Sequence, residues 1–268
     1  MKTLNGPALT ELQIEQYLAR IGIAKAKEPT PEFLAELHYA HISHVPFENI
    51  DVMKGVEVSL DREHLFEKII LGGRGGICSE LNTLYNWLLE SLGFDVVSYI
   101  SRIIAKSAPV QPNSHRVLAV RFDGDGDTCG SRQLTDVGYN YSHYRKPIWL
   151  EEGKSFDDGD CCYEMIRDSF RGWIQNQKTA EGWRQQLSFN ESPQIDLDFV
   201  TPTYFAQHHP NSKINKFTKV SLHKDGEFYA IREGIFLTEK HGVVRELEEL
   251  KDPARETELI RDFFGINI

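Results

Sequence analysis

The sequence predicts an α+β fold, because helical and strand patterns occupy different parts of the chain. Residues 1–94 show mainly helical spacing of apolar side chains, and residues 95–200 hold short β-like runs separated by Gly, Pro and Asp turns. Residues 201–268 combine β-like runs with a final helical pattern. Helices followed by strands, with no regular alternation of the two, are typical of an α+β protein.

The first region contains four candidate helices. Residues 9–21 are amphipathic, and a second helix opens at Thr30 and Pro31. Threonine suits the N-cap position, and proline suits the first helical position, where its missing N–H costs nothing. Residues 62–71 form the third candidate, and the segment that follows Cys78 forms the fourth.

The remaining elements are short. Strands are expected at residues 96–105, 116–122, 132–137, 218–222 and 227–232, with a terminal helix at about 253–264. No internal repeat or low-complexity segment interrupts this order. The length of 268 residues suffices for one large domain or for two to three small ones.

Composition favours a cytoplasmic enzyme that acts on small molecules. The net charge of −10 argues against non-specific binding to nucleic acid or to a membrane surface. No apolar run approaches the roughly 18 residues of a membrane span, and the first residues lack the apolar core of a signal peptide. Four cysteines in a chain of this length do not make a disulfide scaffold.

The most informative segment is the one around Cys78. Gly75 and Gly76 precede this cysteine, and a helical pattern follows it, so Cys78 is expected at a helix start. The unpaired N–H groups and the dipole at a helix N-terminus favour an anion such as a thiolate. Cys78 is therefore a candidate nucleophile; the alternative is an inert cysteine packed at the start of the helix.

A cysteine nucleophile needs a base, and the base needs a group that orients it. His115 follows a turn and leads into a β-like run, so it is expected at the mouth of a strand. Asp136 lies inside a second apolar run, where a buried carboxylate is costly unless it is paired. A hairpin turn at residues 123–127 would bring both residues to the same end of two neighbouring strands. Each residue alone could be structural, but the three together are far more specific.

Several other patterns do not indicate a site. The alternating aspartates of residues 123–127 resemble a calcium loop, but Thr128 and Leu134 stand where the loop needs Gly and an acid. The adjacent Cys161 and Cys162 lack a second ligand pair for zinc, and Cys129 beside the turn is expected to have no catalytic role. The glycines of residues 72–76 lack the Gly-Lys-Ser/Thr of a phosphate loop and are expected to permit a tight path into the Cys78 helix.

Four short segments carry a family resemblance. Residues 74–82 match the pattern Arg-Gly-Gly-x-Cys-x-Glu-x-Asn, and residues 46–49 read Pro-Phe-Glu-Asn. The other two segments are Ser114-His115-Arg116 and Asp136-Val137-Gly138. With these segments, and with gaps over nearly its whole length, the chain resembles the arylamine N-acetyltransferases.

The resemblance implies a fold and a site. It implies a helical bundle over residues 1–94 that carries the catalytic Cys78, a central β-barrel over 95–200 that carries His115 and Asp136, and a C-terminal α/β lid over 201–268. The cysteine-protease-like triad would lie at their junction. An ion pair between Glu48 and Arg74, both motif residues, is expected to be partly buried and to brace the cysteine turn.

The resemblance also implies an activity. Acetyl-CoA would donate an acetyl group to Cys78, and an arylamine, arylhydrazine or N-hydroxyarylamine would accept it, without a metal. The protein would act as a monomer or homodimer. Candidate residues for binding the substrates are Phe47, Ile77, Ser114, Tyr139 and Asn140, of which Phe47 and Tyr139 would line the acceptor cleft.

The chain departs from the family pattern at a few positions. Ser79 replaces a usual phenylalanine, Thr83 replaces a frequent glycine, and Tyr139-Asn140 replaces Phe-Gly. Because the positions of Tyr139 and Asn140 border the cleft in the family, the preferences for acceptor and donor stay open. Three alternatives remain: an amide synthase of the same superfamily, a thiol hydrolase, and an idle binding protein, which would require a broken triad.

Overall fold

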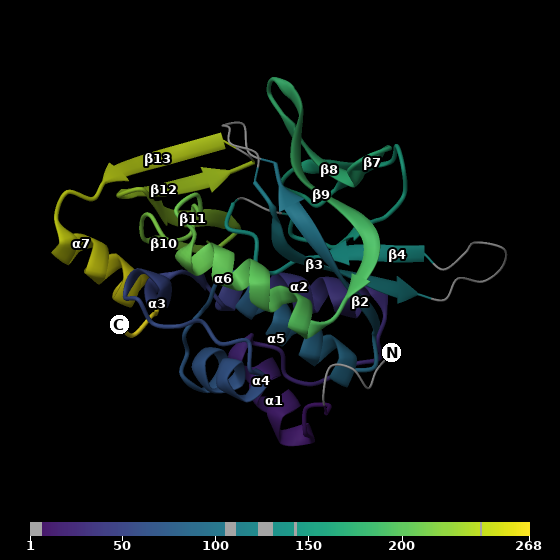
Figure 1. Cartoon of the computed structure of the whole chain (residues 1–268), viewed down its shortest axis with the longest axis horizontal. Coiled ribbons are helices and arrows are strands. Elements are labelled where there is room, and N and C mark those ends of the chain that lie inside the picture. Colours follow the sequence, from purple (N-terminus) through teal and green to yellow (C-terminus); the bar gives the residue numbers. More distant parts are fainter. Residues whose placement is uncertain (1–6, 105–110, 123–130, 142–143, 242) are drawn as a thin grey trace.

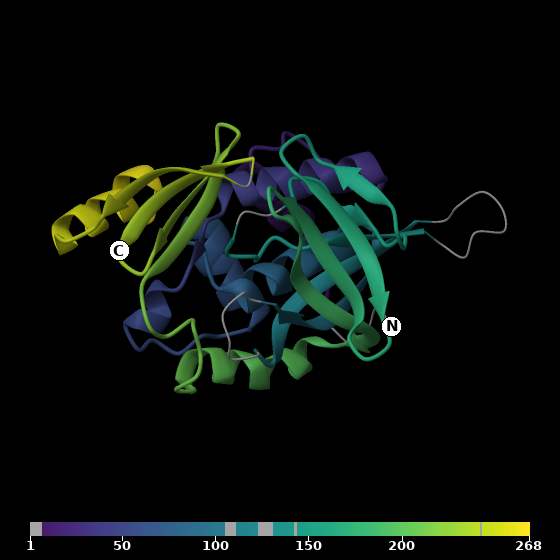
Figure 2. The same ribbon diagram turned by 90° about the horizontal axis from the view of Figure 1, so that it is seen from above.

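A computed structural model describes residues 7–104, 111–122, 131–141, 144–241 and 243–268 of the chain. The described chain forms a layer of helices and two antiparallel sheets (Figure 1). In Figure 2 the smaller sheet, coloured yellow-green, lies to the left of the larger one. The predicted turn at residues 123–127 and Cys129 lie outside the described residues.

The helical layer is built from the first third of the chain. Its elements are α1 (Glu11–Arg20), α2 (Pro31–His44), α3 (Ile50–Met53), α4 (Arg62–Leu65), the π-helical η1 (Phe66–Leu71) and α5 (Cys78–Ser91). Thr30 caps α2 by accepting from the Phe33 N–H, as the sequence predicts. Helix α5 is buried along most of its length and packs in the main apolar core, so it forms the centre of the layer.

The larger sheet has the strand order β5-β4-β3-β2-β9-β8-β7-β6 and curls into a nearly closed barrel (Figure 2). Its strands are β2 (Asp95–Ile103), β3 (Asn113–Phe122), β4 (Ser131–Thr135), β5 (Ile148–Trp149), β6 (Ser155–Asp157), β7 (Cys162–Asp168), β8 (Gly172–Thr179) and β9 (Gly182–Gln194). All described neighbours in this sheet are antiparallel. The mixture of helices and a barrel confirms the predicted fold class.

The smaller sheet combines one strand from the first third of the chain with four strands from the last third. Its strand order is β1 (Phe47–Glu48), β10 (Lys219–Lys224), β11 (Glu227–Arg232), β12 (Ile235–Lys240) and β13 (Val243–Glu249). The short η2 (Asp196–Phe199) and α6 (Val200–His208) precede it, and α7 (Pro253–Glu258) with η3 (Leu259–Phe263) follows it. Strand β1 belongs to the region predicted as a helical bundle, yet it pairs with β10, so the sequence regions are interleaved in space.

Two of the predicted strand boundaries are wrong. Strand β3 begins at Asn113, because residues 113–115 already pair with β2, as in the pair Ser101↔His115. His115 therefore lies within the strand and not at its mouth. Strand β4 ends at Thr135, the last residue that pairs with β3, so Asp136 lies just after a strand and not inside one.

Candidate active site

Cys78 is the first residue of α5 and is reached through a backbone path that only glycine allows. A Cβ atom on Gly75 would lie 1.9 Å from the carbonyl oxygen of Pro46. A Cβ atom on Gly138 would lie 2.7 Å from the Cα of Cys78. Both glycines are therefore required by close approach of neighbouring backbone, and the expected tight path into the Cys78 helix is confirmed.

A buried ion pair braces the turn before Cys78, as the sequence predicts. The Arg74 Nε donates to Glu48 Oε1 at 2.9 Å, and the Arg74 Nη2 lies 2.9 Å from Asp51 Oδ1. Glu48 is buried, and its other oxygen accepts the Ile50 N–H at 2.9 Å. A carboxylate held by several donors in this way is costly to release, so the pair fixes the turn to the β1–α3 segment.

The charge of Glu80, in the first turn of α5, is neutralised by a lysine. The Lys68 Nζ lies 2.7 Å from both Glu80 Oε1 and Asp51 Oδ2. Burial raises the pKa of Glu80, and the Lys68 charge opposes that rise. The other Glu80 oxygen accepts the Ile77 N–H at 2.8 Å. Glu80 therefore caps the start of α5, and the Lys68 charge compensates much of the repulsion between Glu80 and a Cys78 thiolate.

His115 and Asp136 form a direct hydrogen bond in the interior. The His115 Nε2 donates to Asp136 Oδ2 at 2.5 Å, and both side chains are buried. The Asp136 Oδ1 accepts the Asn82 amide at 2.8 Å and the Gly138 N–H at 2.9 Å. With three donors around it, this buried carboxylate is stabilised in its ionised form.

The other side of the His115 ring faces Cys78. Interaction with Cys78 is one of the causes that raise the pKa of His115, and because Nε2 is engaged by Asp136, Nδ1 is the ring nitrogen left for Cys78. Burial disfavours the imidazolium, but the charge and hydrogen bond of Asp136, together with Cys78, outweigh it and raise the pKa of His115. The Tyr139 ring packs edge-on against the imidazole at 5.9 Å. The fold thus brings the three predicted residues together.

Asn82 is a site residue that the sequence argument did not single out. It lies four residues after Cys78, one helical turn along the same face of α5. Besides Asp136, its amide contacts the Arg116 carbonyl oxygen at 2.8 Å and the Val137 N–H at 3.0 Å. An amide side chain at i+4 from Cys78, and therefore on the same face of the helix, is the signal that could have identified it.

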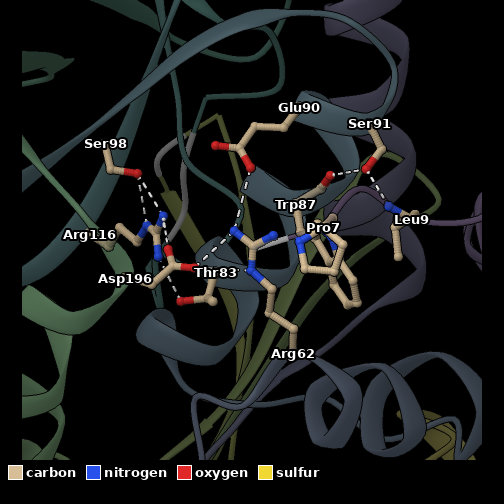
Figure 3. A network of polar contacts seen from close by, with 10 residues as sticks. All are labelled: Pro7, Leu9, Arg62, Thr83, Trp87, Glu90, Ser91, Ser98, Arg116 and Asp196. Atoms are coloured by element: carbon tan, nitrogen blue, oxygen red, sulfur yellow. Dashed lines mark hydrogen bonds and ion pairs between the residues drawn. The ribbon is translucent and has the colours of Figure 1, made fainter. Parts of the chain in front are cut away.

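Arg116, the residue after His115, anchors the strand beneath the site (Figure 3). Its guanidinium donates to Ser98 Oγ of β2 and, at 2.9 Å, to Thr83 Oγ1 of α5. It also pairs with Asp196 of η2 at 2.9 Å and stacks over the Phe199 ring at 4.5 Å. The departure at Thr83 therefore serves this network and lies away from the cleft.

A cavity opens above Cys78 and His115. Four of the predicted binding residues line it, together with residues from α6 and β10. The lining residues are Phe47, Cys78, Ile103, Gln111, Ser114, His115, Gly138, Tyr139, Asn140, Tyr141, Phe205, Ala206, Ser212, Lys213, Ile214 and Lys219.

Ile77 does not line this cavity, contrary to the sequence expectation. Its side chain is 1% exposed and packs in the core of the helical layer. The reason is its position as the N-cap of α5, with an extended backbone that directs the side chain inward while Cys78 faces the cavity. Ser79 is likewise buried and is not among the lining residues.

The unusual Tyr139-Asn140 pair is tied to both sheets. The Tyr139 hydroxyl is hydrogen-bonded to the Gln186 side chain of β9 at 2.9 Å. The Ser221 Oγ of β10 donates to Asn140 Oδ1 at 2.9 Å, and the Arg232 Nη2 of β11 donates to the Asn140 carbonyl oxygen at 2.6 Å. These bonds hold the segment that borders the cleft in one conformation.

Among the residues that the structure describes, no group of three or more His, Cys, Asp or Glu side chains could hold a metal ion. No helix in the described ranges is long and apolar enough to cross a membrane.

Comparison with known proteins agrees with this site. The model of a family described as N-acetyltransferase matches residues 30–268. An arylamine N-acetyltransferase / N-hydroxyarylamine O-acetyltransferase of Salmonella typhimurium is 28% identical over 95% of this chain and 89% of its own. An arylamine N-acetyltransferase of Mycolicibacterium smegmatis is 30% identical over 94% of this chain and 91% of its own.

Solved structures are similar throughout. An arylamine N-acetyltransferase from Salmonella typhimurium superposes with a TM-score of 0.87, at 28% identity over 96% of this chain and 92% of that one. A Mycobacterium marinum arylamine N-acetyltransferase in complex with CoA gives 0.86, at 28% identity over 94% and 92% of the two chains. The chain therefore belongs to the arylamine N-acetyltransferase family, whose members are acyltransferases.

Proposed function

We propose that the protein transfers an acetyl group from acetyl-CoA, through a thioester on Cys78, to an arylamine, an arylhydrazine or an N-hydroxyarylamine. The observation that carries the proposal is that Cys78 and His115 line the same cavity and interact, while a hydrogen bond joins His115 to the buried Asp136 behind it. The CoA bound to the Mycobacterium marinum relative supports a CoA thioester as the donor.

In the first step the Cys78 thiolate attacks the thioester carbonyl carbon, and a tetrahedral oxyanion forms. The N–H groups of Ile77 and Gly138 already donate to Glu80 and Asp136, so we assign the oxyanion to the Cys78 N–H at the helix start. The intermediate collapses with cleavage of the bond to CoA sulfur. CoA leaves as the thiol after taking the proton from the His115 imidazolium.

In the second step the acceptor nitrogen attacks the acetyl-Cys78 carbonyl. His115 accepts the proton of the nitrogen, and Asp136 keeps the imidazole oriented and stabilises its positive charge. The carbon–sulfur bond breaks, the amide leaves, and the Cys78 thiolate with the His115 imidazolium is restored. Aromatic amines suit this chemistry because they are weakly basic and therefore largely unprotonated near neutral pH.

The proposal extends to the layout of the chain. We assign the helical bundle to residues 1–94, the barrel to 95–200 and the lid to 201–268, with the triad at their junction. We further propose a cytoplasmic enzyme that acts as a monomer or homodimer and protects the cell from foreign aromatic amines. Phe47, Ser114, Tyr139 and Asn140 are its candidate binding residues, and their position along the cavity supports this role.

Intact-protein mass spectrometry after incubation with acetyl-CoA tests the covalent step. We expect one acetyl group on the wild type and none on Cys78→Ser. The variants Cys129→Ser, Cys161→Ser and Cys162→Ser should still be acetylated. Burial raises the pKa of the Cys161 thiol to about 11, which keeps it protonated and unreactive. Acetylation that persists in a folded Cys78→Ser variant would contradict the assignment.

Steady-state kinetics provide an independent check. Because the acetyl group must reside on Cys78 before the amine reacts, the kinetics should be ping-pong. Parallel double-reciprocal lines are expected when acetyl-CoA is varied at several fixed amine concentrations. Intersecting lines would support direct transfer in a ternary complex. Rapid loss of acetyl-Cys78 without an amine would instead indicate a hydrolase, and acylation only by long tethered donors would indicate an amide synthase.

A further inference from the structure

A buried lysine lies in the cavity beside the reacting cysteine. Lys219, the first residue of β10, is 6% exposed and lines the same cavity as Cys78 and His115. Its backbone is fixed on both sides by Asn49, whose Oδ1 accepts the Lys219 N–H at 2.7 Å and whose own N–H donates to the Lys219 carbonyl at 3.2 Å. The position of this lysine is thus built into the smaller sheet.

Strand geometry directs the Lys219 side chain toward the site. Alternate residues of a strand share a face, so Lys219 and Ser221 point to the same side of β10. The Ser221 hydroxyl contacts Asn140, which lines the cavity. The same cavity therefore receives the lysine amine.

The charged groups around Lys219 do not neutralise its positive charge. Arg232 lies directly opposite on β11, an arrangement of like charges that destabilises a sheet. The Arg232 guanidinium is engaged by the Asn140 carbonyl and the Tyr141 ring. In the described part of the chain, the Lys219 amine makes no hydrogen bond or ion pair. Burial lowers the pKa of Lys219, the Glu233 charge opposes this, and Arg232 and Lys213 add to it.

The outer part of the cleft is also cationic. A second cavity, which shares Ile103, Tyr139, Tyr141, Lys213 and Lys219 with the first, is lined by the cations Arg184, Lys213, Lys216 and Lys219 and by a single acid, Glu233. This mouth stands out on a chain whose net charge is −10. A locally positive cleft attracts anionic ligands, and an unpaired buried cation gains most from a ligand that brings the missing negative charge.

We propose that Lys219 is a specificity-determining residue that binds a carboxylate carried by the group in the cleft beside Cys78. The carboxylate belongs either to the acyl chain of the thioester, as in malonyl-CoA, or to the ring of the acceptor, as in an aminobenzoate. This inference rests on the acyl transfer proposed above. Lys213 also lines the cavity with Cys78 but is only partly buried, whereas Lys219 is buried there and is therefore placed to select the reacting groups. Arg184 and Lys216, which line only the second cavity, meet the remainder of the donor.

The donor arm measures acylation of Cys78 by mass spectrometry without any amine. Acetyl-CoA and propionyl-CoA are compared with malonyl-CoA and succinyl-CoA, in the wild type and in Lys219→Met, which keeps the length of the side chain and removes its charge. If the carboxylate is on the donor, the rate ratio of malonyl-CoA to propionyl-CoA should fall about tenfold in the variant, as expected for loss of roughly 1.4 kcal/mol.

The acceptor arm starts from enzyme already acetylated by acetyl-CoA. The kcat/KM for 4-aminobenzoate is compared with that for 4-methylaniline, a neutral acceptor of similar shape. If the carboxylate is on the acceptor, this ratio should fall about tenfold in Lys219→Met, while the ratio among the acyl donors stays constant. Lys219→Arg, which keeps the charge, should retain most of the discrimination in whichever arm shows it.

Lys224→Met is the matched control. Lys224 lies on the same strand, is exposed, and contacts the Phe263 ring, away from both cavities. It should leave every ratio unchanged. Equal effects of Lys219→Met on charged and neutral substrates in both arms would overturn the proposal and indicate a contact to CoA common to all donors.

Measurements on the wild type alone also test the proposal. If it prefers neither carboxylated donors nor carboxylated acceptors over their neutral counterparts, the proposal is wrong even if Lys219→Met fails to fold. Failure of acetyl-CoA to acylate Cys78 at all would instead contradict the proposed acyl transfer, so the two failures are distinguishable.

Discussion

The hydrogen bonds of Asp136 explain how three residues from different elements act together. The carboxylate receives His115 from β3, Asn82 from α5 and the backbone of Gly138. Any one of these bonds would orient the carboxylate loosely, but the three donors together fix the positions of both of its oxygens. The orientation of His115 toward Cys78 is therefore set by the buried carboxylate, and the carboxylate is in turn set by Asn82.

The substitution Asn82→Leu tests this dependence. Leucine has a similar size, but it leaves Asp136 with one donor fewer and the Val137 N–H without its acceptor. We expect a loss of about 1–3 kcal/mol in the free energy of unfolding for these buried groups. We also expect kcat to fall more than KM changes, since the loss affects His115 and not substrate binding. Urea unfolding and steady-state kinetics measure the two effects.

Asn86→Leu is the control for this prediction. Asn86 lies one turn further along α5 and is buried, and its amide nitrogen has no hydrogen-bond partner among the described residues. Replacing an unsatisfied buried amide by an apolar group should cost little stability and leave kcat near the wild-type value. A kcat loss of similar size in both variants would show that α5 simply tolerates no change, and Asn82 would then have no special role.

The candidate catalytic residues could be proposed from sequence because each lies in a short local pattern. Cys78 follows two glycines, and His115 and Asp136 lie in β-like runs around a turn. The exact position of Ile77 was not predictable. At a helix start, one residue separates a side chain that faces a cavity from one that faces the core, and only the cap geometry decides between them.

At the level of elements, the decisive contact is the one between the helix that carries Cys78 and the strand that carries His115. Arg116 joins them, since its guanidinium contacts Thr83 of α5, Ser98 of β2 and Asp196 of η2 (Figure 3). Asp196 also accepts from Arg62 of α4 at 2.9 Å. Two arginines thus share the partly buried Asp196, and the network holds five elements, α4, α5, β2, β3 and η2, in register below the site.

Arg116→Met should disrupt this register. The variant leaves Asp196, whose side chain is 22% exposed, still paired with Arg62, so the cost should stay below the about 3–5 kcal/mol typical of a buried charge left without a partner. Because Arg116 adjoins His115, activity should fall at temperatures where the variant is still folded. Thermal unfolding and kcat measured on the same samples separate the two effects.

Arg121→Met provides the comparison on the same strand. The Arg121 side chain is 55% exposed, and its Nε lies 3.8 Å from Asp95. An exposed ion pair of this kind contributes roughly 0–1 kcal/mol, so little change is expected. Equal destabilisation by the two variants would mean that β3 is sensitive to any loss of charge, and the network would not be the cause.

Strands with mixed patterns were the elements that the sequence did not predict. Strand β8 buries Gln175, Asn176 and Gln177, so its interior reads as polar. Strand β13 is an edge strand whose side chains are largely exposed and charged, which protects an open edge but removes the alternation. Periodicity identifies strands with one apolar face; these two strands are held by pairing with their neighbours.

For the whole molecule, the helical layer is the common support of both sheets. Strand β1 comes from this part of the chain and pairs with β10, and α5 packs against β2 and β3. The cavity is therefore lined by residues from three stretches of the chain, 47–78, 103–141 and 205–219, and Figure 1 shows how the helical layer and the two sheets lie together. The sequence predicted which kinds of element each region of the chain contains. Local patterns do not predict pairing between residues far apart in the chain, such as that of β1 with β10.

Three buried histidines make this assembly sensitive to acid. Burial lowers the pKa of His38 to about 4, and of His41 and His223 to about 3. His38 still has partners, with Nδ1 at 2.8 Å from Thr135 Oγ1 and Nε2 at 2.9 Å from the Tyr144 carbonyl. His41 packs between the rings of Tyr17 and Tyr85, and its ring nitrogens make no hydrogen bond within the described structure.

The sign of the acid effect follows from linkage. Unfolded histidine binds a proton near pH 6.5, whereas His41 in the folded protein stays neutral down to about pH 3. As the pH falls below about 6.5, the unfolded state gains protons that the folded state refuses, so stability decreases by about 1.4 kcal/mol per pH unit for each such histidine. His115, whose pKa is raised, contributes its full stability in this acidic range and loses it only as the pH rises.

His41→Phe tests how much one of these histidines contributes to the pH dependence of stability. Phenylalanine fills the aromatic site between Tyr17 and Tyr85 but binds no proton, so the variant should lose about 2 kcal/mol less stability than the wild type between pH 6.5 and pH 5. Urea unfolding at several pH values gives both curves. Tyr85→Phe, which alters the neighbouring ring but keeps His41, should lose as much as the wild type. Parallel curves for His41→Phe and the wild type would mean that His41 is protonated or solvated in the folded protein, and that the acid sensitivity arises at other groups.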